Sequence, residues 1–260
     1  MTLLASFASQ PGLLYRSVRV EIQAHHAGTV LGLFWIVLGP FLLLALYTLI
    51  YAVIFDVRMP GLSRSEYILN VFSGLVLFLA FSQGLSAATT ALSRDRKLLF
   101  SHYPPEFIPA KAVIAAYLIL LPGSVFVIAG DILLSTPSWH LVLLPVVALL
   151  QLCFSVGLGC LLALLGLVVR DLTFLIQYIV IALMIVTPIA YTPTAVPARI
   201  KPLFYFNPLY YYVSANQHLV LLNELPPRIE MVLGVVLSVT MLVVGLAVFQ
   251  RARAAMMDLL

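Results

Sequence analysis

Charged residues are scarce in this chain of 260 residues. Asp, Glu, Lys and Arg together make up 9% of the sequence, whereas 63% of it is hydrophobic. Soluble domains of ordinary composition contain about 25% charged residues. The scarcity of charge therefore excludes an ordinary soluble domain and predicts an integral membrane protein in contact with membrane lipids. The sequence also has no basic, aromatic-rich soluble segment that would bind nucleic acid.

The motifs of common enzymes are missing as well. The sequence contains no HExxH, GxSxG or CxxC motif, and its five histidines share no predicted helix face with carboxylates. The only lysines are Lys97, Lys111 and Lys201, and none completes the GxxxxGK[ST] loop that binds nucleotide phosphates. We therefore expect no catalytic residue, no metal site and no cofactor in this chain.

Six apolar runs are long enough to cross about 30 Å of hydrocarbon as helices. They cover residues 33–55, 68–92, 112–134, 141–169, 172–191 and 231–249. Helices are expected because lipid offers backbone polar groups no other partner. The predicted fold class is an all-α membrane protein, with one transmembrane domain over residues 1–260 and six transmembrane helices.

The Lys and Arg residues are unevenly divided between the two ends of these predicted spans. With a cytoplasmic N-terminus, the cytoplasmic side holds nine, namely Arg16, Arg19, Arg94, Arg96, Lys97, Lys111, Arg170, Arg251 and Arg253. The outer side holds five, namely Arg58, Arg64, Arg199, Lys201 and Arg228. Because positive residues are retained on the cytoplasmic side, we expect both termini to be cytoplasmic.

Residues 94–111, RDRKLLFSHYPPEFIPAK, concentrate charge and proline between the second and third predicted spans. Three prolines restrict any helix in this segment to short pieces, and several Leu, Phe and Ile residues give it an apolar side. Two interpretations are open. The segment is either an ordinary positively charged cytoplasmic loop or a short amphipathic element through which an external source of energy acts on the membrane domain.

Residues 12–31, GLLYRSVRVEIQAHHAGTVL, predict an amphipathic helix that lies along the cytoplasmic membrane surface. Its polar positions are Arg16, Arg19, Gln23 and His26, and its apolar positions are Leu14, Val18 and Ile22. The alternative is a solvated helical cap that leads into the first span.

Residues 192–230 form the predicted outer connection before the last span. They contain six prolines and, together with Tyr191, seven Phe or Tyr residues. The apolar run at about residues 209–222 is too short to span, so a re-entrant or interfacial pair of short helices is expected. The tyrosines could lie in an aromatic belt at the lipid headgroups, or they could line an exit and contact the apolar faces of sugars.

Several motifs, in order along the chain, resemble the ABC-2 type permeases that export polysaccharides. The first is GTVLGLFWIVLGPFLLLALYTLIYAVIF, residues 28–55, in which a Gly-Leu pair, a Trp and a Pro correspond to Leu31, Gly32, Trp35 and Pro40. KLLFSHYPPEFIPAK is similar to the cytoplasmic segment of the family, and RDLTFLIQ, TPIAYTP and FNPLYYYV are similar to its later motifs. Many relatives carry an Arg shortly after the last motif, whereas this chain has Ser214, Ala215, Asn216 and Gln217.

The resemblance implies a multi-pass homodimer in the bacterial inner membrane, bound to two copies of a separate subunit that holds ATP and Mg. The cargo would be a lipid-linked glycan such as O-antigen, capsule or teichoic acid, with O-antigen favoured, and this chain would be no enzyme itself. The residues implied to couple to the ATPase are Arg94, Arg96, Lys97, His102, Tyr103, Glu106, Arg170 and Asp171. The residues implied to line the path or gate are Trp35, Phe41, Tyr47, Tyr51, Pro188, Tyr191, Phe206, Tyr210 and Tyr211.

Two other classes remain open on the residues alone. An ion-coupled carrier for a lipid or sugar would need an ionisable residue or a broken helix in the membrane, and Asp131 is the only formally charged residue within the predicted spans. Its place near the end of the third span favours an interfacial carboxylate. An intramembrane enzyme has no supporting motif.

Overall fold

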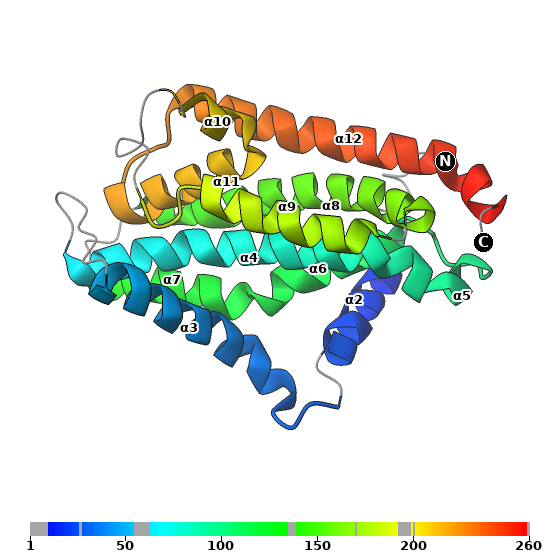
Figure 1. Ribbon diagram of the computed structural model, residues 1–260, viewed down its shortest axis with the longest axis horizontal. Helices are drawn as coiled ribbons and strands as arrows, with labels where there is room; N and C mark the ends of the chain where they lie inside the picture. The colour runs from blue at the N-terminus through cyan, green and yellow to red at the C-terminus, as the bar shows by residue number, and fades with distance from the viewer. Residues whose placement is uncertain are drawn as a thin grey trace.

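The computed structural model describes residues 10–25, 28–54, 63–134, 139–169, 171–191, 199 and 201–258. These residues form helices joined by short turns, with no strand in the described part of the chain (Figure 1). The helices before residue 135 are α2 (Pro11–His25), η1 (Gly32–Phe34), α3 (Trp35–Tyr47), η2 (Thr48–Ile54), α4 (Arg64–Arg94), α5 (Arg96–Leu99), α6 (Phe107–Ile119) and α7 (Leu121–Leu134). Those that follow are η3 (Trp139–Leu143), α8 (Leu144–Val168), α9 (Leu172–Val186), α10 (Lys201–Phe206), α11 (Pro208–Gln217), η5 (His218–Leu222) and α12 (Arg228–Asp258). The all-helical prediction is confirmed.

Among the residues that the structure describes, four helical stretches are long and apolar enough to cross a membrane. They are Arg64–Arg94, Phe107–Leu133, Trp139–Val168 and Arg228–Arg253. Two apolar helices, Trp35–Ile50 and Leu172–Val186, are shorter. They occupy the first and fifth of the apolar runs predicted from the sequence.

Prolines lie in or beside the helices of the first, third and fifth predicted spans. Pro40 lies inside α3, where it removes one backbone donor, and α3 passes into the π-helix η2 after Tyr47. The third predicted span changes direction at Leu120, between α6 and α7, and Pro122 follows in the first turn of α7. The α9 helix ends at Val186, just before Pro188, because the ring of a proline cannot continue a helix.

The start of α4 has the clearest local cause. Ser63 and Glu66 form a capping box, in which the Ser63 Oγ accepts from the Glu66 N–H and the Glu66 carboxylate accepts from the Ser63 N–H at 2.7 Å. Two otherwise unpaired backbone donors are satisfied in this way. The helix then runs for 31 residues to Arg94.

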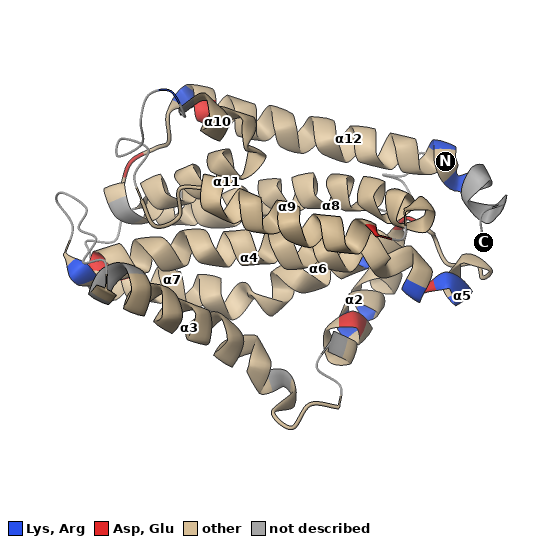
Figure 2. Cartoon of the chain, viewed as in Figure 1, with Lys and Arg blue, Asp and Glu red and all other residues tan. Residues whose placement is uncertain are grey.

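Charged residues gather toward the two ends of the long helices, and the middle of the bundle is nearly free of them (Figure 2). One end holds Arg94, the short helix α5, and Arg251 and Arg253 near the end of α12. The other end holds Arg64 and Arg228, at the starts of α4 and α12. This distribution is the one that a bundle crossing hydrocarbon requires, because a charge in the bilayer centre is costly.

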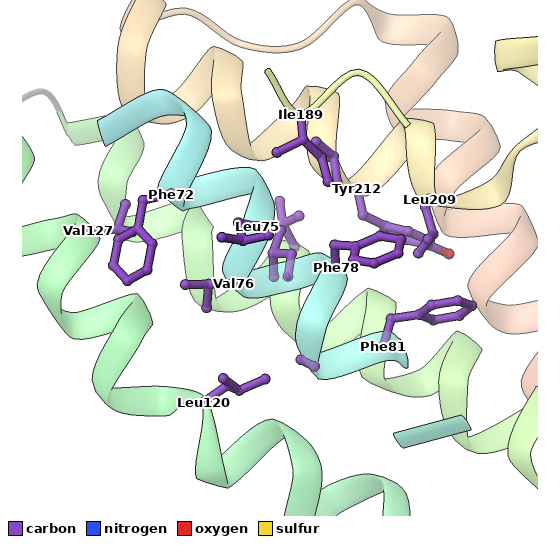
Figure 3. Packing of buried hydrophobic residues seen from close by; sticks show 14 of the residues in the cluster. Phe72, Leu75, Val76, Phe78, Phe81, Leu120, Val127, Ile189, Leu209 and Tyr212 are labelled. Carbon is purple, nitrogen blue, oxygen red and sulfur yellow. The ribbon is translucent and has the colours of Figure 1, made fainter. Parts of the chain in front are cut away.

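Helix α4 is the centre of the bundle. Its side chains at Phe72, Leu75, Phe78 and Phe81 are buried and point among the surrounding helices (Figure 3). Farther along the same core, Phe154 of α8 lies between the rings of Phe81 and Tyr212, at centroid distances of 6.2 and 5.9 Å. The middle of the single chain is thus filled with packed side chains.

Glycines allow α8 to approach its neighbours closely. A Cβ added at Gly157 would lie 2.2 Å from the carbonyl oxygen of Met241 on α12, and one at Gly166 would lie 2.1 Å from that of Thr89 on α4. A Cβ added at Gly245 would lie 2.1 Å from the carbonyl oxygen of Gly157. Small residues at such crossings are typical of membrane helix pairs.

Candidate functional site

The predicted cytoplasmic segment 94–111 divides into an exposed part and a buried part. Asp95 separates α4 from the four-residue helix α5, and a turn over residues 100–106 leads to α6. Arg96, Lys97 and His102 are exposed, and 64% of Phe100 is exposed. Residues 96–102, of which Leu99 is buried and Leu98 half-buried, are called the coupling tip below.

Leu99 and residues 105–111 belong to the core. Ile108 and Leu99 pack in one cluster with Phe249 of α12, and Phe107 is fully buried. Glu106 is only 3% exposed, because the first turn of α6 that follows it is inserted between other helices. Glu106 was expected at the surface, and its burial corrects that expectation.

The second predicted contact lies between α8 and α9. Arg170 is outside the described residues. Asp171 is exposed and its carbonyl oxygen accepts from the N–H groups of Phe174 and Leu175, which starts α9. This turn lies at the same end of the bundle as α5 (Figure 1), so the structure places both predicted contacts at one end.

A group of four charged side chains joins the N-terminal helix to α6 and to the two residues that precede the coupling tip. Lys111 Nζ lies 2.5 Å from Asp95 Oδ2 and 3.3 Å from Glu21 Oε2. Arg94 Nη2 lies 2.5 Å from Glu21 Oε1, and Arg94 Nε lies 3.3 Å from Asp95 Oδ1. Each of the four charges therefore contacts both charges of opposite sign. This group is called the charge ring below.

Three of the four side chains of the charge ring are shielded from solvent, whereas that of Arg94 is 45% exposed. The side chain of Lys111 is 9% exposed, and those of Glu21 and Asp95 are 15% and 18% exposed. Burial by itself would raise the pKa of Asp95, but hydrogen bonds from Lys111 and Arg94 and their positive charges outweigh it and hold that pKa below its ordinary value. Since the folded pKa lies below the unfolded one, this contribution to stability is present at neutral pH and is lost only in strong acid.

Helix α2 presents three different faces. Val18 and Glu21 face the protein, where α2 packs on α6. Leu13 and Val20 are exposed apolar residues on a second side, and Arg16, Arg19 and Gln23 are exposed polar residues on a third side. The described helix ends at His25, and Gly28 has a φ of 83°, so the chain has turned before residue 31. Of the predicted polar positions, His26 lies outside the described residues.

The connection before α12 contains two short α-helices in its described part. Helix α10 is followed by α11, which packs between α4, α8 and α12. Tyr210, Tyr211 and Tyr212 are all buried, so the aromatic-belt interpretation is wrong for these three residues. Tyr210 donates to Glu230 Oε1 at 2.9 Å and Tyr211 donates to the Tyr205 carbonyl oxygen at 2.8 Å. Their hydroxyls are engaged in holding α11 in place.

The polar residues that stand where many relatives carry an Arg also hold this element. Ser214 donates to Glu230 Oε2 at 2.9 Å. Gln217 Nε2 lies 3.3 and 3.2 Å from the carbonyl oxygens of Pro188 and Ile189. These hydrogen bonds fix α11 against the end of α9 and the start of α12.

The TPIA segment, residues 187–190, is buried and bound from three sides. The amide of Asn207 donates to Thr187 Oγ1 at 2.8 Å, and Tyr67 of α4 donates to the Ala190 carbonyl oxygen at 3.0 Å. Gln217 supplies the third contact. Pro188, predicted at the gate, is thus buried, while Tyr191 is partly exposed beside Phe204. At the edge of this region Phe206 is 85% exposed.

We expect Asn207→Ala to destabilise the outer element. Asn207 caps α11 by accepting from the Leu209 N–H at 3.0 Å, and it also donates to Thr187. The loss of a cap together with a buried hydrogen bond costs about 2–3 kcal/mol. Thermal unfolding in detergent, followed by size-exclusion chromatography, measures the change. Thr187→Val removes only the second contact and is expected to cost less, so equal losses in the two variants would contradict this assignment.

The path residues predicted on the first span occupy different environments. Trp35 is partly exposed and lines a cavity of about 360 Å³ with Pro40 and Gln83. Phe41 packs on Phe126 and Phe72, with ring centroids 4.7 and 5.6 Å apart. Tyr47 is buried, and the side chain of Tyr51 lies outside the described part.

The structure does not bring the two predicted groups of path residues together in one chain. Helix α3 packs on α4 and α7, whereas α11 packs on α4, α8 and α12. In Figure 1, α3 and α11 lie on different sides of α4. Asp131, the residue that an ion-coupled carrier would use, is 1% exposed near the end of α7, so it is covered by protein.

Comparison with known proteins gives the family. The family model described as "ABC-2 type transporter" matches residues 13–221. The chain belongs to this family. The resemblance carried by the motifs at residues 28–55, 97–111, 170–177, 187–193 and 206–213 is therefore confirmed.

Curated relatives of this ABC-2 chain match over nearly its whole length. It is 26% identical over 249 residues to the "O-antigen export system permease protein RfbA" of Myxococcus xanthus, with 93% of each chain covered. It is 22% identical over 247 residues to a protein of the same name from Klebsiella pneumoniae, with 92% of each chain covered. A second Klebsiella pneumoniae protein of that name is 22% identical over 248 residues.

Sequence reasoning missed two features of this ABC-2 chain. Neither Glu21 nor Asp95 was singled out, although they complete the charge ring, and Glu230 was not linked to the tyrosines of α11. The sequence did contain an indication of the charge ring, because Glu21 is the one acidic residue in the predicted amphipathic helix. The partners of Glu21 could not be identified from the sequence, since Arg94 and Lys111 lie 73 and 90 positions farther along the chain.

Proposed function

We propose that this chain is the membrane-spanning permease subunit of an ATP-driven exporter that moves a lipid-linked polysaccharide across the bacterial inner membrane, with O-antigen as the favoured cargo. The single observation that carries the proposal is the match over nearly the full length to three O-antigen export permeases. The family is one of transport membrane subunits, and the chain itself has no phosphate-binding loop of the GxxxxGK[ST] type.

The energy enters through the coupling tip. A separate subunit, present in two copies, binds ATP and Mg and seats residues 96–102 of each permease. The tip suits this role because Arg96, Lys97 and His102 are exposed beside the exposed ring of Phe100. Arg and aromatic side chains are enriched in protein interfaces. Asp171, and Arg170 next to it, supply the smaller second contact.

The permease works as a homodimer of six-span subunits. Helices α3 with η2 and α9 complete the six spans, each as a shorter or interrupted helix beside the four long ones. The conduit runs along the seam between two copies, because the core around α4 is filled in the single chain. Both α3 and α9 expose large apolar residues, among them Trp35, Phe174 and Tyr178. These apolar faces could pack against a second copy of the chain as well as against lipid tails.

Orientation follows from charge. The end with the coupling tip also carries Arg251 and Arg253 and the basic face of α2, and it lies in the cytoplasm with both termini. Closure of the ATPase dimer pushes the coupling tips, which moves the spans as rigid bodies and opens the seam. The re-entrant element of α10 and α11, residues 201–217, closes the outer side in the resting state. A polar glycan needs such a path because unpaired hydroxyls cannot enter hydrocarbon at reasonable cost.

Complementation tests this proposal. In a strain whose own O-antigen permease is deleted, co-expression of this chain with its cognate ATPase and cargo pathway is expected to restore polymer at the cell surface, read by lectin or antibody labelling of intact cells. A Walker-lysine variant of the ATPase partner is the control and is expected to leave the polymer inside. If surface labelling is restored equally by the control, the energy does not come from that subunit.

A further inference from the structure

We infer that the charge ring of Glu21, Arg94, Asp95 and Lys111 fastens helix α2 to the coupling tip, so that the two move as one unit when the ATPase pushes the tip. Glu21 and Lys111 are thereby positioning residues for transport, a role that neither the family match nor the names of the relatives assign. The inference rests on the proposed function, and it names how motion of the tip reaches the membrane surface.

Geometry supports a stiff connection. The ring joins three elements, since Glu21 belongs to α2, Arg94 and Asp95 lie where α4 meets α5, and Lys111 lies on α6. Two of the four members precede the coupling tip directly. Because every charge contacts two opposite charges, no member can leave without exposing the others to unbalanced charge in a shielded place.

The shielding makes the ring different from ordinary surface ion pairs. Exposed pairs contribute little and rearrange freely. Here Lys111 is almost covered, and the contact between α2 and α6 around it includes the buried side chain of Val18. Removal of one partner from a shielded pair leaves an uncompensated charge, so the connection is strong against separation.

The other faces of α2 explain what the connection would move. Leu13 and Val20 form an exposed apolar side, and Arg16 and Arg19 form an exposed basic side. A helix with these two sides lies in the plane of the membrane surface, where its arginines meet lipid phosphates. Displacement of the coupling tip then carries α2, and with it the start of α3, through the surface of the inner leaflet.

Three variants of the permease in its complex with the ATPase test the inference. Glu21→Gln and Lys111→Met remove one charge each with little change of shape. The third, Glu21→Cys with Lys111→Cys, joined by a short bismaleimide in a chain whose Cys153 and Cys160 are replaced by Ala, substitutes a covalent link for the ring. We expect each single variant to lower the glycan exported per ATP hydrolysed by about fivefold or more, with unchanged protein abundance, and the linked variant to restore it.

A merely structural role would lower export and ATPase activity together, in step with the amount of folded complex. An unchanged ratio of export to ATP hydrolysis in both single variants overturns the inference, and so does a linked complex that remains uncoupled or is arrested by the link. Rescue by the link is decisive, because a covalent bond restores position without restoring charge.

A cargo-independent measurement separates this inference from the proposed function. Spin labels at Gln23→Cys on α2 and Ser101→Cys on the coupling tip, both exposed positions, report their distance in the complex with and without trapped ATP. We expect one narrow distance in both states for the native ring and a broadened or shifted distance in Glu21→Gln. A distance that already varies with ATP in the native ring excludes movement as one unit, whatever the cargo is.

Discussion

Gly245→Ala is expected to abolish stable folding of the permease. The added Cβ would lie 2.1 Å from the Gly157 carbonyl oxygen and 2.5 Å from its carbonyl carbon. These are backbone atoms, so no side-chain rotation can relieve the overlap, and α8 and α12 must separate. Overpacking of well-packed interiors costs about 1–3 kcal/mol and occasionally more. Here the clash involves the central contact of the two helices, next to the buried Leu246 and Phe249, and we expect the upper end of that range or beyond.

Gly234→Ala is the matched control on the same helix. Its added Cβ would meet the Tyr211 Cβ at 3.6 Å, which is an ordinary contact. Alanine is also a better helix former than glycine by about 1 kcal/mol, so this variant is expected to be neutral or slightly stabilising. Fluorescence-detected size exclusion after heating measures both variants. Equal melting temperatures for Gly234→Ala and Gly245→Ala would contradict the close packing of α8 on α12.

Reversal of the coupling tip, by Arg96→Glu with Lys97→Glu, is expected to reduce export by more than about tenfold while the protein remains inserted and abundant. Both side chains are exposed, and surface substitutions of this kind change stability by about 0.5 kcal/mol or less. The loss arises because the reversed charges meet the same surface of the ATPase that the arginine and lysine bind. Surface glycan and ATPase co-purification, each normalised to permease abundance, measure the effect.

The control places the same change of charge at the same end of the bundle. Arg251→Glu with Arg253→Glu alters the net charge equally, and both residues are exposed near the end of α12. We expect this control to retain export and ATPase binding. A comparable loss in both double variants would indicate that the general positive charge of the cytoplasmic side is important, and the coupling tip would lose its special role.

Much of the fold could be predicted because hydrocarbon imposes a simple rule on the sequence. Each of the six apolar runs contains helix, and Pro188 follows the end of the helix in the fifth run, whereas α3 in the first run continues through Pro40 to Tyr47. What could not be predicted is which helix faces lie inward. In a membrane bundle, an apolar residue suits both lipid and core, so periodicity gives no indication that α4 is central.

The exposure of residues in the candidate site was predicted correctly for some of them and wrongly for others. The position of the coupling segment followed from its charge and prolines, and Arg96 and Lys97 are exposed as expected. Glu106 was expected to be exposed because it is charged, but the core contacts of Phe107 and Ile108 draw it inward. Tyr210 and Tyr211 were expected at an interface or exit. Their hydroxyls instead donate to Glu230 and to the Tyr205 carbonyl group, and these contacts form only when the chain is folded, so the sequence alone does not predict them.

The central claim is that this chain is a channel-forming subunit that takes its energy from a separate ATPase. The most direct test is to co-express the chain with the ATP-binding protein encoded beside it, to extract the complex in mild detergent, and to determine its stoichiometry and ATPase rate. We predict two permease chains with two ATPase chains, and ATPase binding that is lost with Arg96→Glu and Lys97→Glu. A permease that purifies without any ATPase in every detergent, and still transports in proteoliposomes, would contradict the account and favour an ion-coupled carrier that depends on Asp131.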